Sequence, residues 1–398
     1  MTTELLAPAG GQEALVAAVQ SGADAVYMGF GAFNARRSAR NFSDEEFRAA
    51  VSYCHLRGVK VYLTLNTLVT DRELPLLVEE ARIASECGVD AILVQDWGVL
   101  AALREIIPDV PLHASTQMSL HTLSGAQESA RLGMTRAVLA RELNREEIAE
   151  ICEKSPIEIE AFVHGAMCMS FSGRCLLSAY LTGRDANRGA CAQPCRWNYH
   201  VVESKREGQY FPVEETDEGT YIFNAKDLCM IDHLQELLDA GVDSLKIEGR
   251  NKSAYYVAII TNAYRAALDA AMAGQPAPEW ALREVVQVSH REYCTGFFYG
   301  RENAAQRYAD SSYVRNCDVV AVVNRWEQGR LYLTQRNRFF AGDSLEIVAA
   351  GQPVTVAAQG LENEDGESIE TANHAMMQCS IACETAFPAG SVVRKPVE

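Results

Sequence analysis

The stretch SGADAVYMG, at residues 21–29, decides the fold, because it recurs with small changes as CGVDAILVQ at residues 87–95 and AGVDSLKIEG at residues 240–249. Each copy has a glycine that ends a helix, then an aspartate, then an apolar run with strand character. One helix-to-strand joint therefore recurs at three points of the chain. Such a recurring joint predicts a parallel sheet built from βα units.

Eight short apolar runs alternate with longer segments of helical period. We expect strands at residues 4–8, 25–30, 60–66, 91–95, 112–117, 136–141, 157–164 and 244–248. Ser43 and Asn144, which stand before acidic helical segments, are the predicted N-caps of two of the helices. Eight such units predict an α/β fold of the TIM-like (β/α)8 barrel type. An open doubly wound sheet is the alternative, but no GxGxxG motif follows the first strand.

The chain divides into two domains. Residues 1–310 would form the barrel, with a cysteine-rich insertion at residues 166–229 after the seventh strand. Beyond this, short strands separated by Gly, Asn, Asp and Pro turns predict a small antiparallel β-barrel at residues 311–398. Because the insertion leaves the C-terminal end of a strand, we expect it to cover the active-site face of the barrel.

Polar residues follow the predicted strands and are candidate site residues. Any one of them is more often a helix cap or a solvated loop residue, so the argument depends on their meeting on one face of the barrel. The candidates are Asn66, Gln95, Asp96, Gln117, Arg141, Glu142, His164, Lys246, Glu248 and Arg250.

Composition sets broad limits on location and partners. The sequence shows no signal peptide and no apolar run of about 20 residues, so we expect a cytoplasmic protein without a membrane span. The formal net charge of -17 argues against a generally basic surface for nucleic acid, although a local basic patch is compatible with it. In a reducing compartment the 12 cysteines are core residues, metal ligands or nucleophiles rather than disulfides.

Four of these cysteines fall within one stretch, CMSFSGRCLLSAYLTGRDANRGACAQPC. Cys168, Cys175, Cys191 and Cys195 share it with three glycines and three arginines, and Arg196 follows directly. Thiolates hold iron-sulfur clusters, and nearby arginines would offset their negative charge. The C-x6-C-x15-C-x3-C spacing is neither a ferredoxin pattern nor a zinc-ribbon pattern. A 4Fe-4S cluster is therefore the leading interpretation and a structural zinc ion is the alternative, with Cys229 as an alternative fourth ligand.

A catalytic cysteine is a further alternative. Glu160, His164 and Cys168 follow one another closely and could supply the carboxylate, base and nucleophile of a peptidase triad. Such neighbours occur often by chance, so this interpretation requires geometry.

Several stretches together resemble the collagenase-like peptidase family of unassigned catalytic type. They are the cysteine-rich run at residues 160–197, LLAPAG at residues 5–10, SLKIEGR at residues 244–250, and QRNRFFAGDSLEI and AFPAGSVVRK in the C-terminal part. Several members of that family are oxygen-independent hydroxylases that carry a 4Fe-4S cluster. The two-domain layout is most similar to the tRNA hydroxylases that make 5-hydroxyuridine at the wobble position, with prephenate as the hydroxyl donor.

The resemblance implies a function and a site. It implies an RNA hydroxylase whose cluster lies at the barrel mouth, with His164, Glu248 and Arg250 binding or polarising a small carboxylate donor. In a ubiquinone-modifying pair of the family, three cluster cysteines match Cys168, Cys175 and Cys191, and the fourth comes from further along the chain. A collagenase-like peptidase, or a non-catalytic partner subunit with a structural metal, are the alternatives. A homo-oligomer or a paralogous partner subunit is left open.

A tRNA substrate would need a positively charged approach surface. The candidate side chains are Arg36, Arg37 and Arg40 after the second strand, Arg184 and Arg188 in the cysteine-rich stretch, and Arg336 and Arg338 in the C-terminal domain. Surface arginines are usually only solvated, so each is a candidate rather than an assignment.

Overall fold

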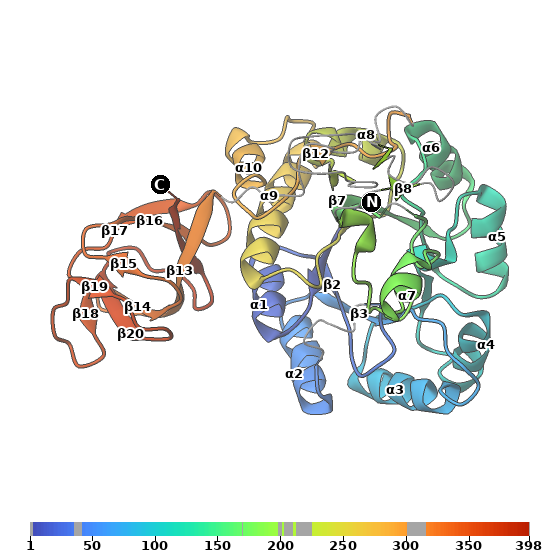
Figure 1. Ribbon diagram of the computed structural model, residues 1–398, viewed down its shortest axis with the longest axis horizontal. Coiled ribbons are helices and arrows are strands. Elements are labelled where there is room, and N and C mark those ends of the chain that lie inside the picture. Colours follow the sequence, from blue (N-terminus) through green and yellow to red (C-terminus); the bar gives the residue numbers. More distant parts are fainter. Residues whose placement is uncertain are drawn as a thin grey trace.

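The computed structural model describes residues 3–35, 42–168, 170–197, 201–202, 210–211, 225–300 and 316–397. Eight parallel strands form a closed barrel, because the eighth strand pairs with both the seventh and the first. The strands are β1 (Glu4–Ala9), β2 (Ala25–Met28), β3 (Lys60–Leu65), β4 (Ala91–Val94), β5 (Leu112–Ala114), β6 (Arg136–Val138), β7 (Glu158–Ala166) and β11 (Ser244–Ile247). The predicted barrel is confirmed (Figure 1).

Helices surround this barrel in the expected alternation. They are α1 (Gln12–Gln20), α2 (Asp44–His55), α3 (Leu74–Cys87), α4 (Trp97–Ile106), α5 (Leu123–Arg131), α6 (Arg145–Lys154), α8 (Leu234–Asp239), α9 (Ala254–Met272) and α10 (Glu279–Glu284). Ser43 and Asn144 form capping boxes at the starts of α2 and α6, so both predicted N-caps are confirmed.

The aspartate of the recurring joint locks neighbouring strands together. The carboxylates of Asp24, Asp90 and Asp243 accept hydrogen bonds of 2.7–2.8 Å from backbone N–H groups of the adjacent strands β1, β3 and β7. The N–H of each aspartate donates to a carbonyl of the same adjacent strand. Each copy of the sequence pattern therefore encodes one strand-to-strand clamp.

The interior of the barrel contains a buried network of charged side chains. Arg136 on β6 donates to Glu4 on β1 at 2.6 Å and to Glu160 on β7 at 3.2 Å, and Lys246 on β11 donates to Glu160 at 2.6 Å. Tyr62 and apolar side chains of other strands pack beside these groups. Two carboxylates and two cations balance one another, which burial requires.

Lys246 therefore does not serve the barrel mouth. It was a candidate because it ends a predicted strand, but its side chain is buried in this ion network.

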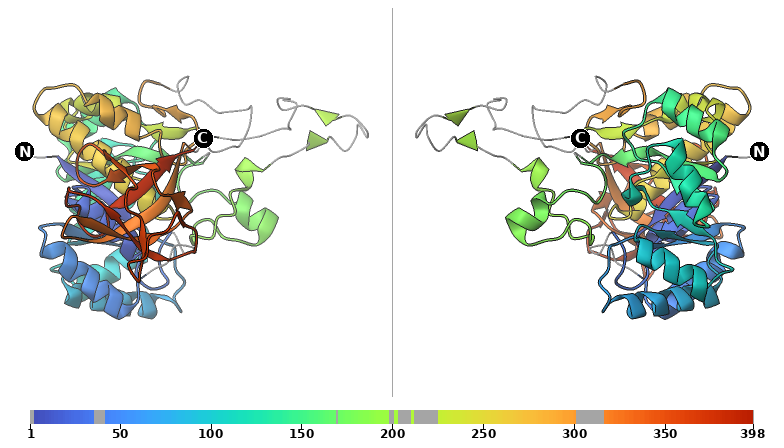
Figure 2. Two further views of the ribbon diagram at one scale, coloured as in Figure 1. Left: turned by 90° about the vertical axis from the view of Figure 1, so that its left-hand side faces the viewer. Right: turned by 90° about the vertical axis from the view of Figure 1, so that its right-hand side faces the viewer.

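The insertion after β7 lies on one side of the barrel (Figures 1 and 2). Its described elements are α7 (Leu177–Thr182), the 3-10 helix η2 (Pro194–Arg196), and the short strands β8 (Val201–Val202) and β9 (Tyr210–Phe211). The chain returns through β10 (Asp227–Cys229), which pairs antiparallel with the end of β7, and through the 3-10 helix η3 (Ile231–His233). After α10, β12 (Tyr293–Cys294) adds to β10.

The C-terminal domain is an antiparallel half-barrel. Its seven-stranded sheet has the order β17-β16-β21-β13-β14-β20-β18. The strands of the domain are β13 (Cys317–Glu327), β14 (Arg330–Gln335), β15 (Phe339–Phe340), β16 (Ser344–Val348), β17 (Val354–Ala357), β18 (Glu362–Asn363), β19 (Thr371–Ala372), β20 (Gln378–Ala382) and β21 (Val392–Pro396). The predicted boundary at residues 310 and 311 lies outside the described residues.

Buried polar contacts fix the C-terminal domain to the barrel. Arg394 on β21 forms a bidentate ion pair with Glu284 of α10, at 2.7 and 2.8 Å, and donates to the hydroxyl of Tyr255 on α9. Asn262 of α9 exchanges two hydrogen bonds with the backbone of Gly351. Such contacts give the joint between the domains a defined geometry.

Among the described helices, none combines the length and the apolar composition that a membrane crossing requires.

The strand clamp predicts a matched pair of stability effects. Asp243→Ala should lower the free energy of unfolding by about 1–3 kcal/mol, because the N–H of Ile159 loses its acceptor in a mostly buried place. Asp243→Asn keeps an acceptor oxygen for this N–H. Because burial raises the pKa of the native carboxyl, a neutral side chain is well tolerated there, and Asp243→Asn should lower the free energy of unfolding much less. Urea denaturation measures both; equal losses for the two variants would contradict the clamp.

Candidate active site at the barrel mouth

The C-terminal ends of the strands and the insertion meet at the barrel mouth. Asn187 of the insertion accepts hydrogen bonds from the Leu68 N–H at 3.0 Å and from Gln95 at 3.3 Å. Its amide nitrogen donates to Gln117 at 3.5 Å and to the Gly173 carbonyl at 3.2 Å. The predicted position of the insertion over the mouth is confirmed, and two predicted strand-end residues, Gln95 and Gln117, hold it there.

A second contact anchors the same part of the insertion. Arg188 forms a bidentate ion pair with Glu73, in the loop before α3, with both distances 2.7 Å. The hydrogen bond from Arg188 holds the pKa of Glu73 well below its usual value. The sequence made Arg188 a candidate for contacting RNA, but in the structure its guanidinium is paired with Glu73 and anchors the insertion.

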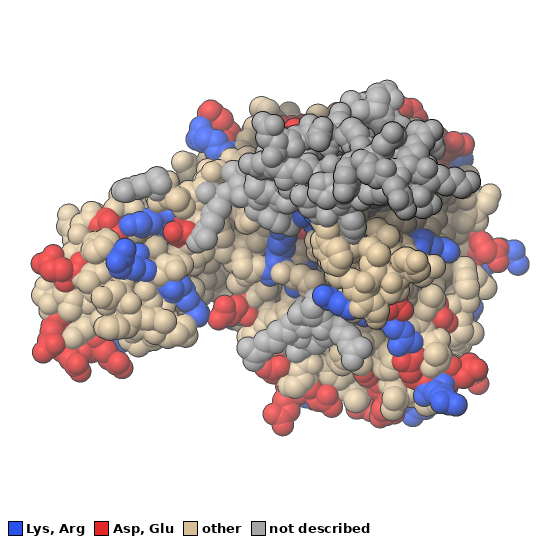
Figure 3. Space-filling view, viewed as in Figure 1, with Lys and Arg blue, Asp and Glu red and all other residues tan. Residues whose placement is uncertain are grey.

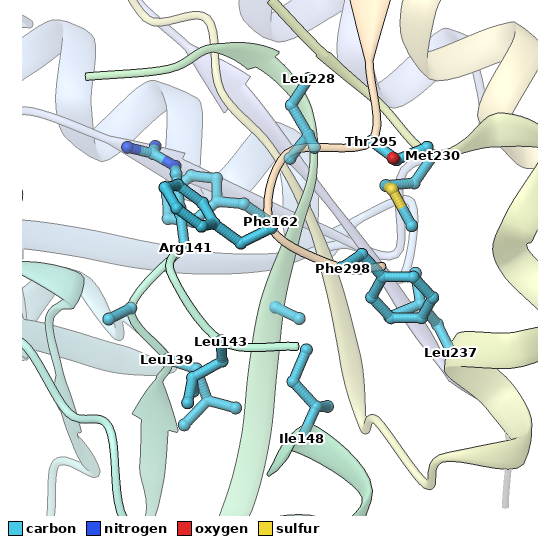
Figure 4. A pocket seen from close by; sticks show the side chains of 13 residues that line it. Leu139, Arg141, Leu143, Ile148, Phe162, Leu228, Met230, Leu237, Thr295 and Phe298 are labelled. Atoms are coloured by element: carbon cyan, nitrogen blue, oxygen red, sulfur yellow. The ribbon is translucent and has the colours of Figure 1, made fainter. Parts of the chain in front are cut away.

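Arg141 and Glu248 form an ion pair at the mouth. Their side chains are 3.4 Å apart, and the guanidinium of Arg141 also donates to Ser172 of the insertion at 3.3 Å. The guanidinium lies 3.7 Å from the centre of the Phe162 ring, and Figure 4 shows the two side chains side by side. Stacking on an aromatic ring and pairing with a carboxylate fix the direction of Arg141.

A small apolar cavity adjoins this ion pair (Figure 4). Its volume is about 30 Å³, and Leu139, Leu143, Ile148, Met230 and Phe298 are among its lining residues. That space holds one or two water molecules and is too small for a nucleobase. The cavity therefore does not provide the substrate site.

Arg250 reaches the mouth from the end of β11. It is almost fully buried, and its guanidinium donates to the neutral oxygens of Thr64 and Asn34. A side chain at Gly10 would lie about 2.0 Å from the backbone oxygen of Arg250, so the glycine is required for this close approach. Arg250 thus brings a rigidly held positive charge to the same end of the barrel as Arg141.

His164 does not share this site. It is 1% exposed and lies on the outer side of the barrel wall, where its two ring nitrogens face the hydroxyls of Tyr264 and Tyr293 at 3.2 and 3.4 Å. Burial lowers its pKa to about 3, so the ring is neutral. The predicted contact between His164 and a donor at the mouth is not supported by this position.

A register shift explains the position of His164. Lys246 pairs with Phe162, but the next residue, Ile247, pairs with His164, so β7 contains one extra residue. If side chains alternated strictly along β7, His164 would point into the barrel as Phe162 does. The bulge places one extra residue between them, so the His164 side chain points outward instead.

The peptidase triad does not assemble for the same reason. Glu160 points into the barrel, where it pairs with Arg136 and Lys246, whereas His164 faces outward among tyrosines. Cys168 is exposed beyond the end of the strand. The carboxylate and the base therefore lie on opposite sides of the barrel wall.

The four cysteines of the insertion lie on segments of the chain that contact one another. Burial raises the pKa of the Cys195 thiol, Arg196 opposes this, and the charges of Cys168, Cys191 and Cys175 each raise it further. Two hydrogen bonds join these segments: Arg196 donates to the Met167 carbonyl at 3.3 Å, next to Cys168, and the Ala192 N–H donates to Ser178 of α7 at 2.9 Å. Among the described residues, however, no three His, Cys, Asp or Glu side chains lie close enough to hold one metal ion. A single zinc ion would bring its thiolates to within about 3.8 Å of each other, whereas a cluster core spaces them more widely.

Backbone groups support two of these sulfurs. The N–H of Leu177 donates to Cys175 Sγ at 3.4 Å, and the N–H of Gln193 donates to Cys191 Sγ at 3.3 Å. Hydrogen bonds of this kind stabilise thiolates and tune the potential of a cluster. The four-thiol donor set thus fits a group that takes four cysteine ligands.

Cys229, the alternative fourth ligand, lies elsewhere. It is on β10 opposite His164, and its sulfur is 3.8 Å from the hydroxyl of Tyr264. Burial raises its pKa to about 11. The geometry therefore favours Cys195 over Cys229 as the fourth member of the set.

The remaining predicted residues have other roles. Asp96 caps α4, Asn66 donates to Ser115 at 3.2 Å, and burial raises the pKa of Glu142. Arg184 donates to the Ala190 carbonyl and Arg336 pairs with Glu13, while Arg338 is exposed. The candidates Arg36, Arg37 and Arg40 lie outside the described residues.

Sequence reasoning missed the contacts that close the site. Glu73 and Asn187 anchor the insertion, and a buried pair of Asp227 and Arg291 stands at the end of β10, 3.6 Å apart. For the anchoring of the insertion, the sequence offers one signal, which is the position of Asn187 and Arg188 in a glycine-containing loop. Asp227 and Arg291 are 64 residues apart, and no local pattern joins them.

Two protein-family models match this chain. The model of peptidase family U32 matches residues 10–307, and the model of its C-terminal domain matches residues 315–394. The chain belongs to peptidase family U32. The predicted family resemblance is thereby confirmed.

Relatives of the chain carry different names. The tRNA hydroxylation protein P1 of Bacillus subtilis is 34% identical, covering 98% of this chain and 94% of its own. The 23S rRNA 5-hydroxycytidine C2501 synthase of Escherichia coli is 41% identical over 67% of this chain and 39% of its own. A collagenase of Porphyromonas gingivalis is 36% identical over 75% of this chain and 74% of its own.

The anchoring ion pair gives a testable prediction. Arg188→Ala should release the loop around residues 183–190 from the barrel mouth and speed backbone hydrogen exchange there, with little change in the barrel strands. Arg131→Ala, which removes an exposed ion pair within α5, is the matched control. Exchange in the loop that is as slow as in the unaltered protein would show that the Glu73 contact does not hold the insertion.

Proposed function

We propose that this chain is an iron-sulfur-dependent, oxygen-independent RNA hydroxylase that forms 5-hydroxyuridine at the wobble position of tRNA, with prephenate as the hydroxyl donor. The observation that carries the proposal is that the insertion with the four cysteines covers the barrel mouth and contacts, through Ser172, the Arg141–Glu248 ion pair there. The names of two relatives, a tRNA hydroxylation protein and an rRNA 5-hydroxycytidine synthase, support RNA hydroxylation.

The proposed cofactor is a 4Fe-4S cluster held by Cys168, Cys175, Cys191 and Cys195. When bound, such a cluster supplies one-electron transfer to reactants beside it. Burial raises the pKa of the Cys195 thiol and Arg196 partly opposes this, while backbone N–H groups donate to the sulfurs of Cys175 and Cys191. A bound iron atom would compensate the burial of the Cys195 thiolate, and the two N–H groups would stay as donors to ligating sulfurs.

The arginines would bind the donor. Guanidinium groups bind carboxylates through two parallel hydrogen bonds, and a donor with two carboxylates matches two arginines at one mouth. Thr64 and Asn34 hold the guanidinium of Arg250, and Phe162 and Glu248 direct that of Arg141, so both are pre-oriented. His164 stays behind the barrel wall and would act only through the packing of β7.

The overall reaction is redox-neutral. The pyrimidine C5–H bond is replaced by C5–OH, a two-electron oxidation, while the donor loses its hydroxyl group and gains hydrogen, a two-electron reduction. No external oxidant is needed.

A peptidase is the second candidate because one relative is named collagenase. The separation of Glu160 from His164 by the barrel wall speaks against a Glu–His–Cys triad. A non-catalytic partner subunit with a structural metal is the third alternative. Wild-type protein that cleaves denatured collagen, with the cleavage lost in Cys168→Ala, would favour the peptidase.

The cluster ligands are tested by metal content. Protein purified without oxygen should contain about four irons and four sulfides per chain. Cys195→Ser should lose most of this iron, whereas Cys229→Ser should retain it, because Cys229 lies among tyrosines rather than beside the other three thiols. The reverse pattern would move the fourth ligand to Cys229, and iron-free wild-type protein would contradict the cluster.

The function is tested in cells. A strain lacking the gene should lose 5-hydroxyuridine from its tRNA nucleosides, as measured by mass spectrometry, and the wild-type gene should restore it. Arg250→Lys keeps the charge but loses the planar fork, so it should restore at most about a tenth of the modification. Arg131→Lys on the exposed face of α5 is the control and should restore all of it. An unchanged nucleoside profile in the deletion strain would refute the proposed reaction.

A further inference from the structure

A pocket lies between the barrel and the C-terminal domain, separate from the site at the mouth. Its volume is about 280 Å³, several times that of the cavity beside Arg141. The barrel contributes Lys252, Ser253, Tyr255, Tyr256 and Ser289, and the C-terminal domain contributes Asn337 among others. One cation and several hydroxyl and amide groups therefore surround a space large enough for a phosphate group.

The pocket opens at the end of the eighth strand. Lys252 follows Arg250 by two residues, and α9 begins immediately afterwards with Ser253 as its N-cap. In (β/α)8 barrels, the loops after the last strands and an adjoining helix N-terminus frequently form a phosphate site. Here a lysine and a cavity accompany that helix, which has 19 residues.

The surroundings of Lys252 favour an anion. Its ammonium lies 3.4 Å from the Ser289 carbonyl and 5.1 Å from the centre of the Tyr256 ring. Burial lowers its pKa and Arg291 and Arg196 lower it further, while the carboxylates of Asp227 and Glu248 oppose this without cancelling it. A bound anion would offset both the burial and the neighbouring positive charges.

The walls of the pocket are fixed. Tyr255 receives a hydrogen bond from Arg394, the residue that clamps the two domains, and Tyr256 donates to the backbone of Glu248 at 3.0 Å. Asn337 is held through its donation to the Val319 carbonyl at 2.7 Å. The site is therefore preformed, which lowers the entropic cost of binding.

A cationic rim continues from the pocket onto the C-terminal domain. Arg338 and Lys395 lie 5.4 and 5.9 Å from the centre of the Phe340 ring, which is 43% exposed, and Lys395 also pairs with Asp343 at 3.1 Å. Figure 3 shows lysine and arginine side chains on this domain in the same view that looks onto the barrel mouth. An exposed aromatic ring with cations beside it suits a base next to a backbone phosphate.

We infer that the pocket between the domains binds a backbone phosphate of the RNA, with Lys252 as the cationic contact and Ser253, Ser289 and Asn337 as hydrogen-bonding groups. The inference rests on the proposed function in that RNA is taken as the substrate. The phosphate contact would place the strand across both domains and direct a neighbouring nucleotide toward the mouth.

The test is the salt dependence of tRNA binding. Lys252→Gln should weaken binding of unmodified tRNA severalfold and reduce the slope of log affinity against log salt by about 0.7–0.9, the contribution of one phosphate contact. Asn337→Asp, from the other domain, should weaken binding through charge repulsion. Lys154→Gln on the exposed end of α6 is the control and should change neither quantity. Iron content should be the same in all variants.

The possible outcomes separate the two proposals. Unchanged affinity and slope for folded Lys252→Gln, confirmed by an unaltered thermal transition, would overturn the phosphate site and leave the hydroxylase proposal standing. Wild-type protein that does not bind tRNA would refute both. Calorimetric titration with inorganic phosphate alone distinguishes an RNA phosphate from a free phosphate ion. If Lys252→Gln abolishes binding of inorganic phosphate but leaves tRNA binding unchanged, the pocket is a site for free phosphate and the RNA contact is contradicted.

Discussion

The fold depends on the buried ion network that joins four strands inside the barrel. Glu4, Arg136, Glu160 and Lys246 come from β1, β6, β7 and β11, the strands at and beside the point of barrel closure. Burial raises the pKa of Glu4 but Arg136 more than offsets this, so the pKa lies below its usual value and the carboxylate stays charged. Removing one member of such a network leaves a buried charge uncompensated, which typically costs about 3–5 kcal/mol.

This arrangement separates stability from chemistry along the barrel. The ion network occupies the end where the strands begin, and the opposite end presents Arg141, Glu248 and Arg250 beneath the insertion. The described residues of the segment 168–197 lie outside the hydrophobic core of the barrel, and polar contacts from Asn187 and Arg188 hold the segment in place. A segment anchored in this way can carry a cysteine-bound group without being part of the hydrophobic core.

Local patterns predicted the parts of the structure that depend on local geometry. The recurring joint predicted the barrel because each aspartate clamps an adjacent strand. The long separation between the seventh and eighth strands predicted the insertion, because it far exceeds one loop and one helix. The side to which His164 points could not be predicted, because one extra residue in β7 reverses the alternation. The pairing of Arg188 with Glu73 also escaped prediction, since the two residues are 115 positions apart.

The central claim is that the thiols above the mouth and the arginines within it perform one reaction on RNA. The most direct measurement incubates the iron-loaded protein with unmodified tRNA and prephenate in strict absence of oxygen, then analyses the nucleosides by mass spectrometry. The account predicts 5-hydroxyuridine in amounts that require prephenate and disappear with Cys168→Ser. Product that forms only when oxygen is admitted, or no product from protein with a full iron content, would contradict it.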